Sequence, residues 1–287
     1  MSASALALAD RQPLTPAAIG RAATLALHDE LSLAPKPGLV TLTDNGSHAD
    51  MDAHSFMRSL FALRHYFTQI TEAGLAGAGF AVLEQCGIAA EARMLKATGG
   101  INTHRGAIFM IGMLCAAAGA ALREQEGGLH PALLRAALRR HWGQALALRS
   151  QRASSLPGGI ASRRYGLRGA SEEAALGFPV LFDTTLPALT LAFKRGLPPR
   201  EARLEALMHT IAVLDDSNLA HRGGLEGLRH AQQLAQAFVA RGGVARPEGL
   251  SELQAIADAF VARRLSPGGA ADTLAAACWI TRICDTP

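Results

Sequence analysis

Five polar segments interrupt an otherwise apolar, helix-forming sequence, and each combines Gly or Pro with polar or ionisable side chains. Their residue types suit the handling of phosphate groups and of a divalent cation. Helix starts and Arg side chains bind anions, whereas carboxylates bind Mg²⁺. The five segments span residues 35–52, 98–106, 165–179, 215–224 and 266–269.

The segment at 98–106, TGGINTHRG, directly precedes an uncharged apolar stretch. If a helix begins there, free backbone N–H groups and the positive end of the helix dipole favour an anion. Arg105 can clamp a phosphate, and His104 can donate a hydrogen bond or a proton. The GxxxxGK[ST] spacing of a P-loop is missing. Asn102 and Thr103 are equally well explained as helix caps.

In the first segment, Lys36 lies between two prolines, which stiffen the backbone and would hold the ammonium group in one direction. Asp44, His48 and Asp50 follow within one short loop. Oxygen ligands of this kind suit Mg²⁺ carried by a nucleotide, whereas zinc would need more His or Cys. Taken alone, Asp44 is also explained by a turn with the Asn and Gly that follow it.

Asp215 and Asp216 follow a predicted helix at 199–214, where the negative end of the helix dipole disfavours carboxylates. Placing two carboxylates there costs stability unless a cation or a ligand compensates, so Asp216 is a candidate base or metal ligand. Asp215 is equally well explained as a solvated surface charge. Glu30, near the end of the first predicted helix, is open to both interpretations.

The elements that position these segments are predicted to be helices. Of the 287 residues, 49% are hydrophobic and only 5% aromatic, and Ala, Leu and Gly dominate. This balance favours an all-α fold, a single compact domain whose polar inter-helix loops form one active-site cleft. Spacing and start signals predict helices at 16–33, 53–66, 81–97, 104–124, 130–149, 172–178, 187–195, 199–214, 224–241, 249–264 and 269–284. We expect a disordered tail at 1–13 and a mobile basic loop, a lid, at 150–166.

The net charge of +4 comes almost wholly from Arg, since the chain has only three Lys residues. The arginines are scattered, which favours small anionic substrates over nucleic acid. The four Cys residues form no CxxC pair and the N-terminus lacks signal-peptide features, so a cytoplasmic protein is expected. The apolar stretch at 106–122 is slightly short for a membrane span and rich in Ala and Gly, which favours a buried core helix.

Together the segments resemble the triphosphoribosyl-dephospho-coenzyme A synthase family from about Glu30 to Leu274. The resemblance rests on motifs in the family's order: PKPGLV, Gly-x-His-x-Asp-Met at 46–51, TGGINTHRGAIF, YGLRGA with GFP, Asp-Ser-Asn at 216–218 with HRGG, and SPGG. The family makes the prosthetic-group precursor of malonate decarboxylase and citrate lyase.

The resemblance implies that ATP and 3′-dephospho-coenzyme A give 2′-(5″-triphosphoribosyl)-3′-dephospho-coenzyme A and adenine, with Mg²⁺ bound to the ATP. The triphosphate survives intact, so it can serve as a handle that holds the sugar in attack geometry. The product would pass to a carrier-protein transferase. A chain of this length without a fused transferase favours the malonate decarboxylase pathway, and a homodimer is the default oligomer.

The resemblance also implies roles for individual residues. Catalytic roles fall to Asp50, His104 and Asp216. Metal contacts fall to Glu30, Asp44, Asp50 and Asp216. Substrate contacts fall to Lys36, His48, Thr98, Gly99, Gly100, Asn102, Thr103, Arg105, Arg168, Glu173, Asn218, His221 and Arg222.

Three positions depart from the family pattern, which usually has Lys at Arg105, Thr at Ser217 and Arg at Ser171. The first two substitutions keep the needed chemistry. The third removes a cation, and Arg163 or Arg164 is expected to supply the phosphate contact instead.

Two other functions remain open from the sequence. A Mg²⁺-dependent hydrolase of nucleotide or ADP-ribosyl bonds would need similar acidic clusters and anion-binding loops. A non-catalytic nucleotide- or coenzyme-binding module would use the same loops only to bind. Transfer releases adenine only when both substrates are present, whereas hydrolysis acts on ATP alone and a binding module shows no turnover.

Overall fold

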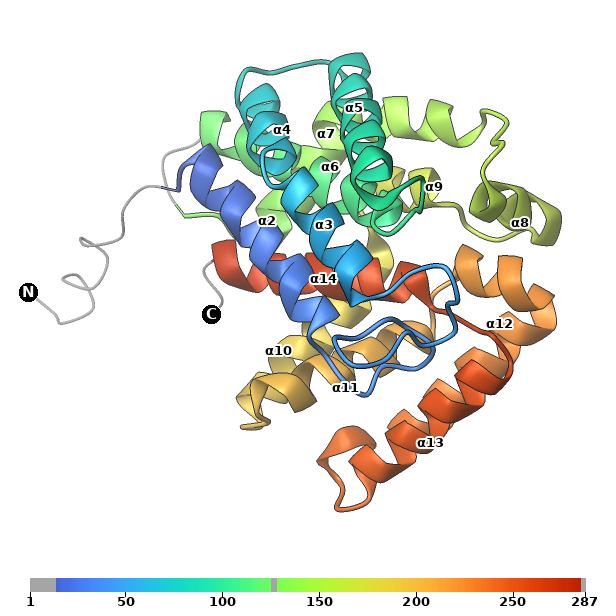
Figure 1. Cartoon of the computed structure of the whole chain (residues 1–287). Helices are drawn as coiled ribbons and strands as arrows, with labels where there is room; N and C mark the ends of the chain where they lie inside the picture. Colours follow the sequence, from blue (N-terminus) through green and yellow to red (C-terminus); the bar gives the residue numbers. More distant parts are fainter. Residues whose placement is uncertain (1–13, 125–127, 285–287) are drawn as a thin grey trace, which may run out of the picture.

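The computed structural model describes residues 14–124 and 128–284, and this part of the chain contains helices and no strand (Figure 1). The all-α prediction is therefore confirmed. The tail predicted for residues 1–13 lies outside the described residues. The α-helices are α2 (Pro16–Leu31), α3 (Ala53–Leu63), α4 (Tyr66–Leu75), α5 (Phe80–Thr98), α6 (Arg105–Glu124), α7 (Pro131–Ser150), α8 (Pro157–Tyr165), α9 (Ala170–Ala175), α10 (Leu186–Lys194), α11 (Pro199–Ile211), α12 (Ser217–Ala240), α13 (Gly249–Ala262) and α14 (Gly268–Ile283).

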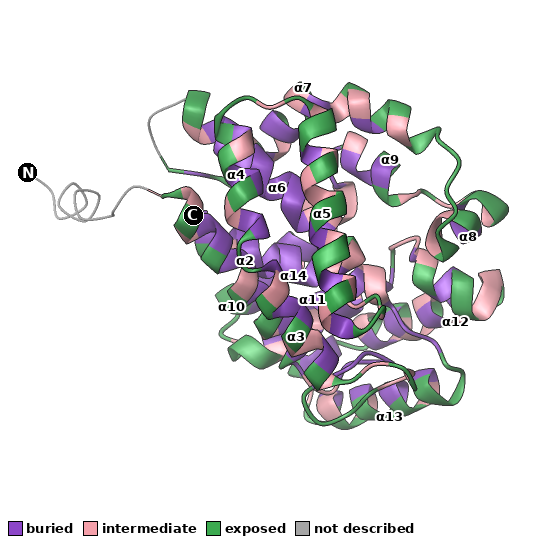
Figure 2. Cartoon of the chain, turned by 45° about the horizontal axis from the view of Figure 1, so that its top comes forward, coloured by how far each residue is buried: buried purple, intermediate pink, exposed green. Residues whose placement is uncertain are grey.

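Helices α6 and α14 form the centre of the molecule, and Figure 2 shows both as mostly buried. Small residues let the neighbouring helices approach closely. A Cβ added to Gly119 of α6 would lie 2.1 Å from the carbonyl oxygen of Thr71 on α4, and one added to Gly74 of α4 would lie 2.1 Å from that of Ala116 on α6. Such contact between backbones is open to Gly alone.

Helix α6 is the one described helix that is long and apolar enough to span a membrane, with a mean hydropathy of 1.7. However, 72% of its apolar window is buried against the rest of the protein. A helix that is apolar on all sides and buried among other helices is typical of the core of a helical fold. The structure thus accounts for the apolar stretch without a membrane.

Two predicted elements are wrong. The helix predicted over 53–66 ends at Leu63, and α4 then starts at Tyr66. The loop predicted at 150–166 contains α8, which has Pro157 in its first turn and ends at Gly166 in the left-handed conformation (φ 64°). These are common start and stop residues of a helix, and the Ser, Gly and Arg content of the segment obscured them.

Helix α12 begins seven residues before the predicted start at 224. Asp216 caps its N-terminus, and Gly224 (φ 65°, ψ −169°) interrupts the helical backbone between a short first part and a longer second part. The predicted helix corresponds to the second part. The first part carries Asn218, His221 and Arg222, so residues expected in a loop lie on a helix.

Candidate active site

All five polar segments line one cavity of about 920 Å³. The volume lies within the range of small-molecule and cofactor sites. Helices α6, α12 and α14 each contribute residues of their first turn to the cavity wall. The cavity thus combines several helix N-termini, which favour anions.

The start of α6 leaves two buried polar atoms free. The side-chain oxygen of Asn102 accepts a hydrogen bond from the Arg105 N–H at 3.1 Å, so Asn102 is a helix cap as well as a cavity residue. Thr103 Oγ1 and His104 Nε2 are buried without a hydrogen-bond partner among the described residues, and both residues line the cavity. Buried polar atoms without partners are rare in proteins, and these two are available to a ligand.

The imidazole of His104 is fixed by its surroundings. Ser59 Oγ lies 2.6 Å from Nδ1, and the Phe56 ring packs against the imidazole edge-on, with 4.9 Å between the centroids. Burial, helped by the charge of Lys36, lowers the pKa of His104 to about 3. The ring is therefore neutral at ordinary pH and acts through hydrogen bonds, so donation of a proton from an imidazolium is not available to it.

Asp216 is buried at the meeting point of two helix starts. Its Oδ1 accepts hydrogen bonds from Asn218 N at 2.9 Å and Leu219 N at 3.4 Å, and its Oδ2 accepts one from Ala270 N at 3.0 Å. The expectation that it stands at a disfavoured negative helix end is wrong, because α11 ends at Ile211 and Asp216 caps α12. Burial raises its pKa, and the backbone N–H groups partly oppose the rise.

Asp272 is a cavity residue that the sequence analysis missed. It lies in the first turns of α14 against the start of α6, where a Cβ added to Gly106 would fall 1.9 Å from its Oδ2. Burial and the charges of Glu30 and Asp216 raise its pKa well above the usual value, and a hydrogen bond from Ala107 N–H lowers it. The available signal was a lone carboxylate near the start of an otherwise apolar helix.

Glu30, in the cavity wall, forms a buried ion pair with Lys36. Lys36 Nζ donates to Glu30 Oε1 at 2.5 Å and to the Glu30 carbonyl oxygen at 2.7 Å. Burial lowers the Lys36 pKa, while the Glu30 carboxylate raises it. Glu30 lines the cavity and Lys36 does not. The ammonium group thus neutralises Glu30 in this structure, and the phosphate contact expected of Lys36 stays a prediction.

The predicted metal loop is only partly at the cavity. His48 Nε2 lies 2.9 Å from Ser266 Oγ, and its Nδ1 lies 3.7 Å from Oδ1 of Asp50, whose side chain is 65% exposed at the rim. Asp44 is exposed, accepts a hydrogen bond from Gly46 N at 2.6 Å and does not line the cavity. The turn interpretation of Asp44 is the one that the structure shows.

Thr98, Gly99 and Gly100 do not line the cavity. Thr98 Oγ1 donates to the carbonyl oxygens of Met94 at 3.0 Å and Ile101 at 2.5 Å. The two glycines have φ angles of 70° and 93° and end α5 in the left-handed conformation. In this structure they close a helix and hold the next segment in place, and contact with substrate stays a prediction.

Three of the arginines predicted to contact substrate line the cavity and are already oriented by protein groups. Arg105 Nε lies 2.6 Å from Glu91 Oε1. Arg168 donates to Glu173 at 3.1 Å, and Arg222 donates to two backbone carbonyl oxygens. Oriented guanidinium groups lose less freedom when they bind a phosphate. Asn218 and His221 also line the cavity, from exposed positions on α12.

The guanidinium group that contacts Ser171 belongs to a residue that the sequence did not single out. Arg149, near the end of α7, donates a hydrogen bond to Ser171 Oγ, and both residues line the cavity. Arg163 also lines it, whereas Arg164 lies over the Tyr165 ring and does not. Arg149 lies inside a regular helix, so nothing in its local sequence distinguishes it from a surface arginine.

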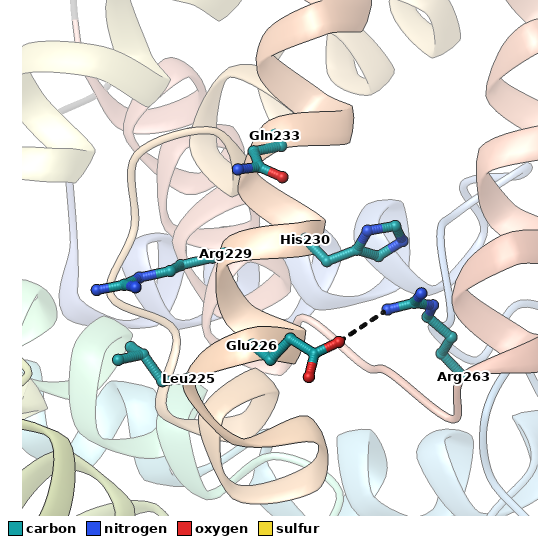
Figure 3. Close-up of a pocket in the computed structure, with 6 residues that line it drawn as sticks. All are labelled: Leu225, Glu226, Arg229, His230, Gln233 and Arg263. Atoms are coloured by element: carbon teal, nitrogen blue, oxygen red, sulfur yellow. Dashed lines mark ion pairs between the residues drawn. The ribbon is translucent and has the colours of Figure 1, made fainter.

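Among the described residues, no three His, Cys, Asp or Glu side chains are grouped closely enough to hold a metal ion by themselves. A second hollow of about 400 Å³ lies between α12 and α13 and contains none of the predicted residues (Figure 3). Its Glu226–Arg263 pair spans 3.8 Å, and the two side chains are 90% and 50% exposed. Surface pairs of this kind contribute little, so the larger cavity is the candidate site.

Comparison with known proteins identifies the family of this chain. The profile of the family described as ATP:dephospho-CoA triphosphoribosyl transferase (CitG) matches residues 16–286. A protein of Acinetobacter calcoaceticus, named probable 2-(5''-triphosphoribosyl)-3'-dephosphocoenzyme-A synthase, is 37% identical over 261 residues, which are 91% of this chain and 89% of the relative. A protein of the same name from Vibrio cholerae serotype O1 (strain M66-2) is 35% identical over 276 residues, covering 92% and 87%. No solved structure matches. The chain belongs to the ATP:dephospho-CoA triphosphoribosyl transferase family.

Proposed function

We propose that the protein transfers the 5-triphosphoribosyl group of ATP to the ribose 2′-hydroxyl of 3′-dephospho-coenzyme A and releases adenine. The observation that carries the proposal is the cavity itself, in which helix N-termini and arginines meet a group of buried carboxylates. Membership of the family gives the reaction, and the charges of the cavity suit both of its requirements. Phosphates need the cationic groups, and the reacting sugar carbon needs the carboxylates.

In this reaction the bond from the sugar C1 to adenine breaks, and a bond from C1 to the hydroxyl oxygen forms. The proton that the hydroxyl loses balances the one that adenine gains. Asp216 and Asp272 have raised pKa values, so they retain a proton at higher pH than a solvated carboxyl does and suit proton exchange. Ionised carboxylates beside C1 would also stabilise the positive charge that develops there.

The neutral imidazole of His104 and the Thr103 hydroxyl offer hydrogen bonds at the start of α6. With Arg105 they form the proposed grip on a phosphate chain. Because the phosphates are held and not broken, this grip contributes positioning alone. Remote binding of this kind can lower the barrier by fixing the attack geometry.

The carboxylates also fit Mg²⁺ that arrives with ATP. Mg²⁺ is commonly held by one or two carboxylates together with substrate phosphates and water, so a group of three protein ligands is not required. Of the four predicted contacts, Glu30, Asp50 and Asp216 line the cavity and Asp44 does not, and Asp272 joins the three by position. When bound, the ion would neutralise charge on the triphosphate.

The proposal is tested by incubating the purified protein with ATP and 3′-dephospho-coenzyme A, together and separately. Adenine and a product with the mass of the triphosphoribosyl adduct are expected only when both substrates are present. Adenine or phosphate released from ATP alone would favour the hydrolase. Tight binding in calorimetry without any product would favour the binding module.

The proposal extends to the use of the product, which a carrier-protein transferase would attach to the acyl carrier protein of malonate decarboxylase. Citrate lyase needs the same compound. Supplying the product to each apo carrier protein with its own transferase, and comparing the genes beside this one, would separate the two pathways.

A further inference from the structure

Two glutamates of helix α5 line the cavity, and each pairs with at least one arginine from another element. Glu84 and Glu91 are seven residues apart, which is two helical turns and about 10 Å along the axis. Glu91 pairs with Arg105 at the start of α6 at 2.6 Å. Glu84 pairs with Arg149 near the end of α7, with 3.0 Å between Oε1 and Nε. The cavity thus presents two separate guanidinium positions.

The guanidinium group of Arg149 is held in one orientation. It pairs with Glu84, donates to Ser171 Oγ and lies over the Phe109 ring at 5.1 Å from the centroid. Its side chain keeps 35% of its surface exposed, and all four of these residues line the cavity. An oriented, partly exposed guanidinium with a hydroxyl beside it suits an anionic oxygen ligand.

Positive charge at this position exceeds negative charge. Arg152 NH1 lies 3.3 Å from both carboxylate oxygens of Glu84, so one glutamate is shared by two arginines. Arg163 donates to the Arg152 carbonyl oxygen at 3.0 Å and adds a third guanidinium group. All three arginines line the cavity. Among the described residues, Glu84 is the one carboxylate that pairs with these arginines, and the exposed Glu172 next to Ser171 forms no ion pair with them, so the excess of positive charge favours an anion.

We propose that Arg149, Arg152 and Arg163, together with the Ser171 hydroxyl, form a second anion-binding subsite that takes the diphosphate or triphosphate ester of a nucleotide. We call it the α7–α8 subsite. It is distinct from the grip at Arg105, because the glutamates that pair with Arg105 and Arg149 are two turns apart on α5. Phosphate groups bound at the two positions would therefore repel each other less than neighbouring ones. Its assignment to one of two substrates rests on the proposed function, because that reaction brings together two nucleotides with phosphate chains.

Calorimetric titration of the full chain with ATP and with 3′-dephospho-coenzyme A, each alone, tests the subsite. Arg149→Gln is expected to weaken one nucleotide by roughly ten- to hundredfold, as for the loss of a charge-assisted hydrogen bond, and to leave the other within about twofold. The nucleotide affected identifies whether the α7–α8 subsite takes the triphosphate or the diphosphate. Unchanged binding of both nucleotides, or equal weakening of both, would overturn the proposal.

Two further variants separate a binding role from a structural one. If Arg149 only stabilises the fold through its ion pair, Glu84→Gln should weaken binding as Arg149→Gln does. The α7–α8 subsite predicts the opposite. The amide oxygen of Gln can still accept the hydrogen bond from Arg149 Nε and keep the guanidinium oriented, while loss of the carboxylate leaves more positive charge, so Glu84→Gln should bind the same nucleotide at least as tightly. Arg140→Gln is the matched control, since Arg140 is also on α7 and pairs with Glu124 at 2.7 Å outside the cavity.

Arg152→Gln replaces Arg149→Gln if the latter fails to fold, because the Arg152 side chain is 62% exposed. Adenine release by the wild type is measured separately. If the wild type releases no adenine but Arg149→Gln still weakens one nucleotide selectively, the subsite stands and the proposed reaction falls. If adenine is released but the Arg149 and Arg152 variants bind both nucleotides like the wild type, the reaction stands and the subsite falls.

Discussion

The imidazole of His104 lies between Ser59 and Phe56 in the cavity wall, where burial and the charge of Lys36 disfavour its charged form. Its pKa is lowered to about 3 in the folded protein, against an ordinary value near 6.5. The unfolded chain therefore takes up a proton as pH falls below 6.5 and the folded protein does not. The resulting stability is complete above pH 6.5 and is lost as pH falls toward 3.

We expect His104→Gln to lose less stability on acidification than the wild type, with a difference on the order of 3 kcal/mol between pH 7 and pH 4. Denaturant unfolding at both pH values measures it. His54→Gln, at an exposed position on α3, is the control and should follow the wild type. Identical acid sensitivity of His104→Gln and wild type would show that His104 titrates normally.

Asp216→Asn tests the charge of the carboxylate with little change of shape. Asn is as good a helix cap as Asp, so the hydrogen bonds to the start of α12 should persist. The amide nitrogen of Asn would face the Ala270 N–H, whose acceptor in the wild type is Oδ2, so we expect a folded protein of reduced stability. Turnover should nevertheless fall by at least about a hundredfold, as expected for loss of a group that exchanges a proton. Wild-type turnover in a folded Asp216→Asn protein would remove Asp216 from the reaction.

Asp272→Asn is expected to lose activity and to gain stability. The raised pKa means that the ionised carboxylate is disfavoured in the folded state, so its stability contribution is lost as pH rises through the folded-state pKa. The melting temperature of the variant relative to wild type should therefore increase from pH 4 upward. Asp258→Asn, at an exposed position on α13, should show no such trend, and a lower melting temperature for Asp272→Asn at neutral pH would contradict the account.

At the scale of elements, the site depends on where helices begin. The starts of α6, α12 and α14 meet at the cavity, and Asp216 bonds to the N–H groups of two of them. Gly224 then breaks α12 after the short first part, from which Asn218, His221 and Arg222 line the cavity. Its backbone conformation (φ 65°, ψ −169°) is essentially restricted to Gly.

Gly224→Ala is expected to lower the free energy of unfolding by roughly 1–3 kcal/mol and to weaken substrate binding, because the first part of α12 must shift. Denaturant unfolding and the KM of both substrates measure these effects. Gly143→Ala is the matched control, since Gly143 is helical in α7, has its nearest neighbour at 3.6 Å and lies outside the cavity. It should stabilise by about 0.5–1 kcal/mol.

At the scale of the whole molecule, α6 links core and site. Its first turn borders the cavity, and the rest of the helix packs between α4, α7 and α14. A displacement of α6 would therefore alter the packing and the anion grip together.

Native-state hydrogen exchange should find the amides of α6 from Ile108 to Ala121 among the slowest in the protein, opening only with global unfolding. The amides of α8, whose helix is short and has few buried residues, should exchange much faster. Fast exchange along α6 would mean that it is not the core helix. Recovery of the protein only with detergent would support the membrane alternative.

The sequence by itself determined the helical class, most helix positions and the segments that line the cavity, because these follow from local spacing, capping and Gly or Pro breaks. Only the tertiary structure decided which side chains are available to a ligand and in which charge state. In the folded protein Lys36 pairs with Glu30, and Asp44 lies outside the cavity. Burial keeps His104 neutral, and Asp216 accepts hydrogen bonds from two helix starts. The tertiary structure also brought Asp272, Glu84 and Arg149 into the cavity wall. The contacts of Asp216 with Ala270 and of His104 with Ser59 join residues far apart in the chain, and burial and charge pairing depend on neighbours that local sequence does not specify.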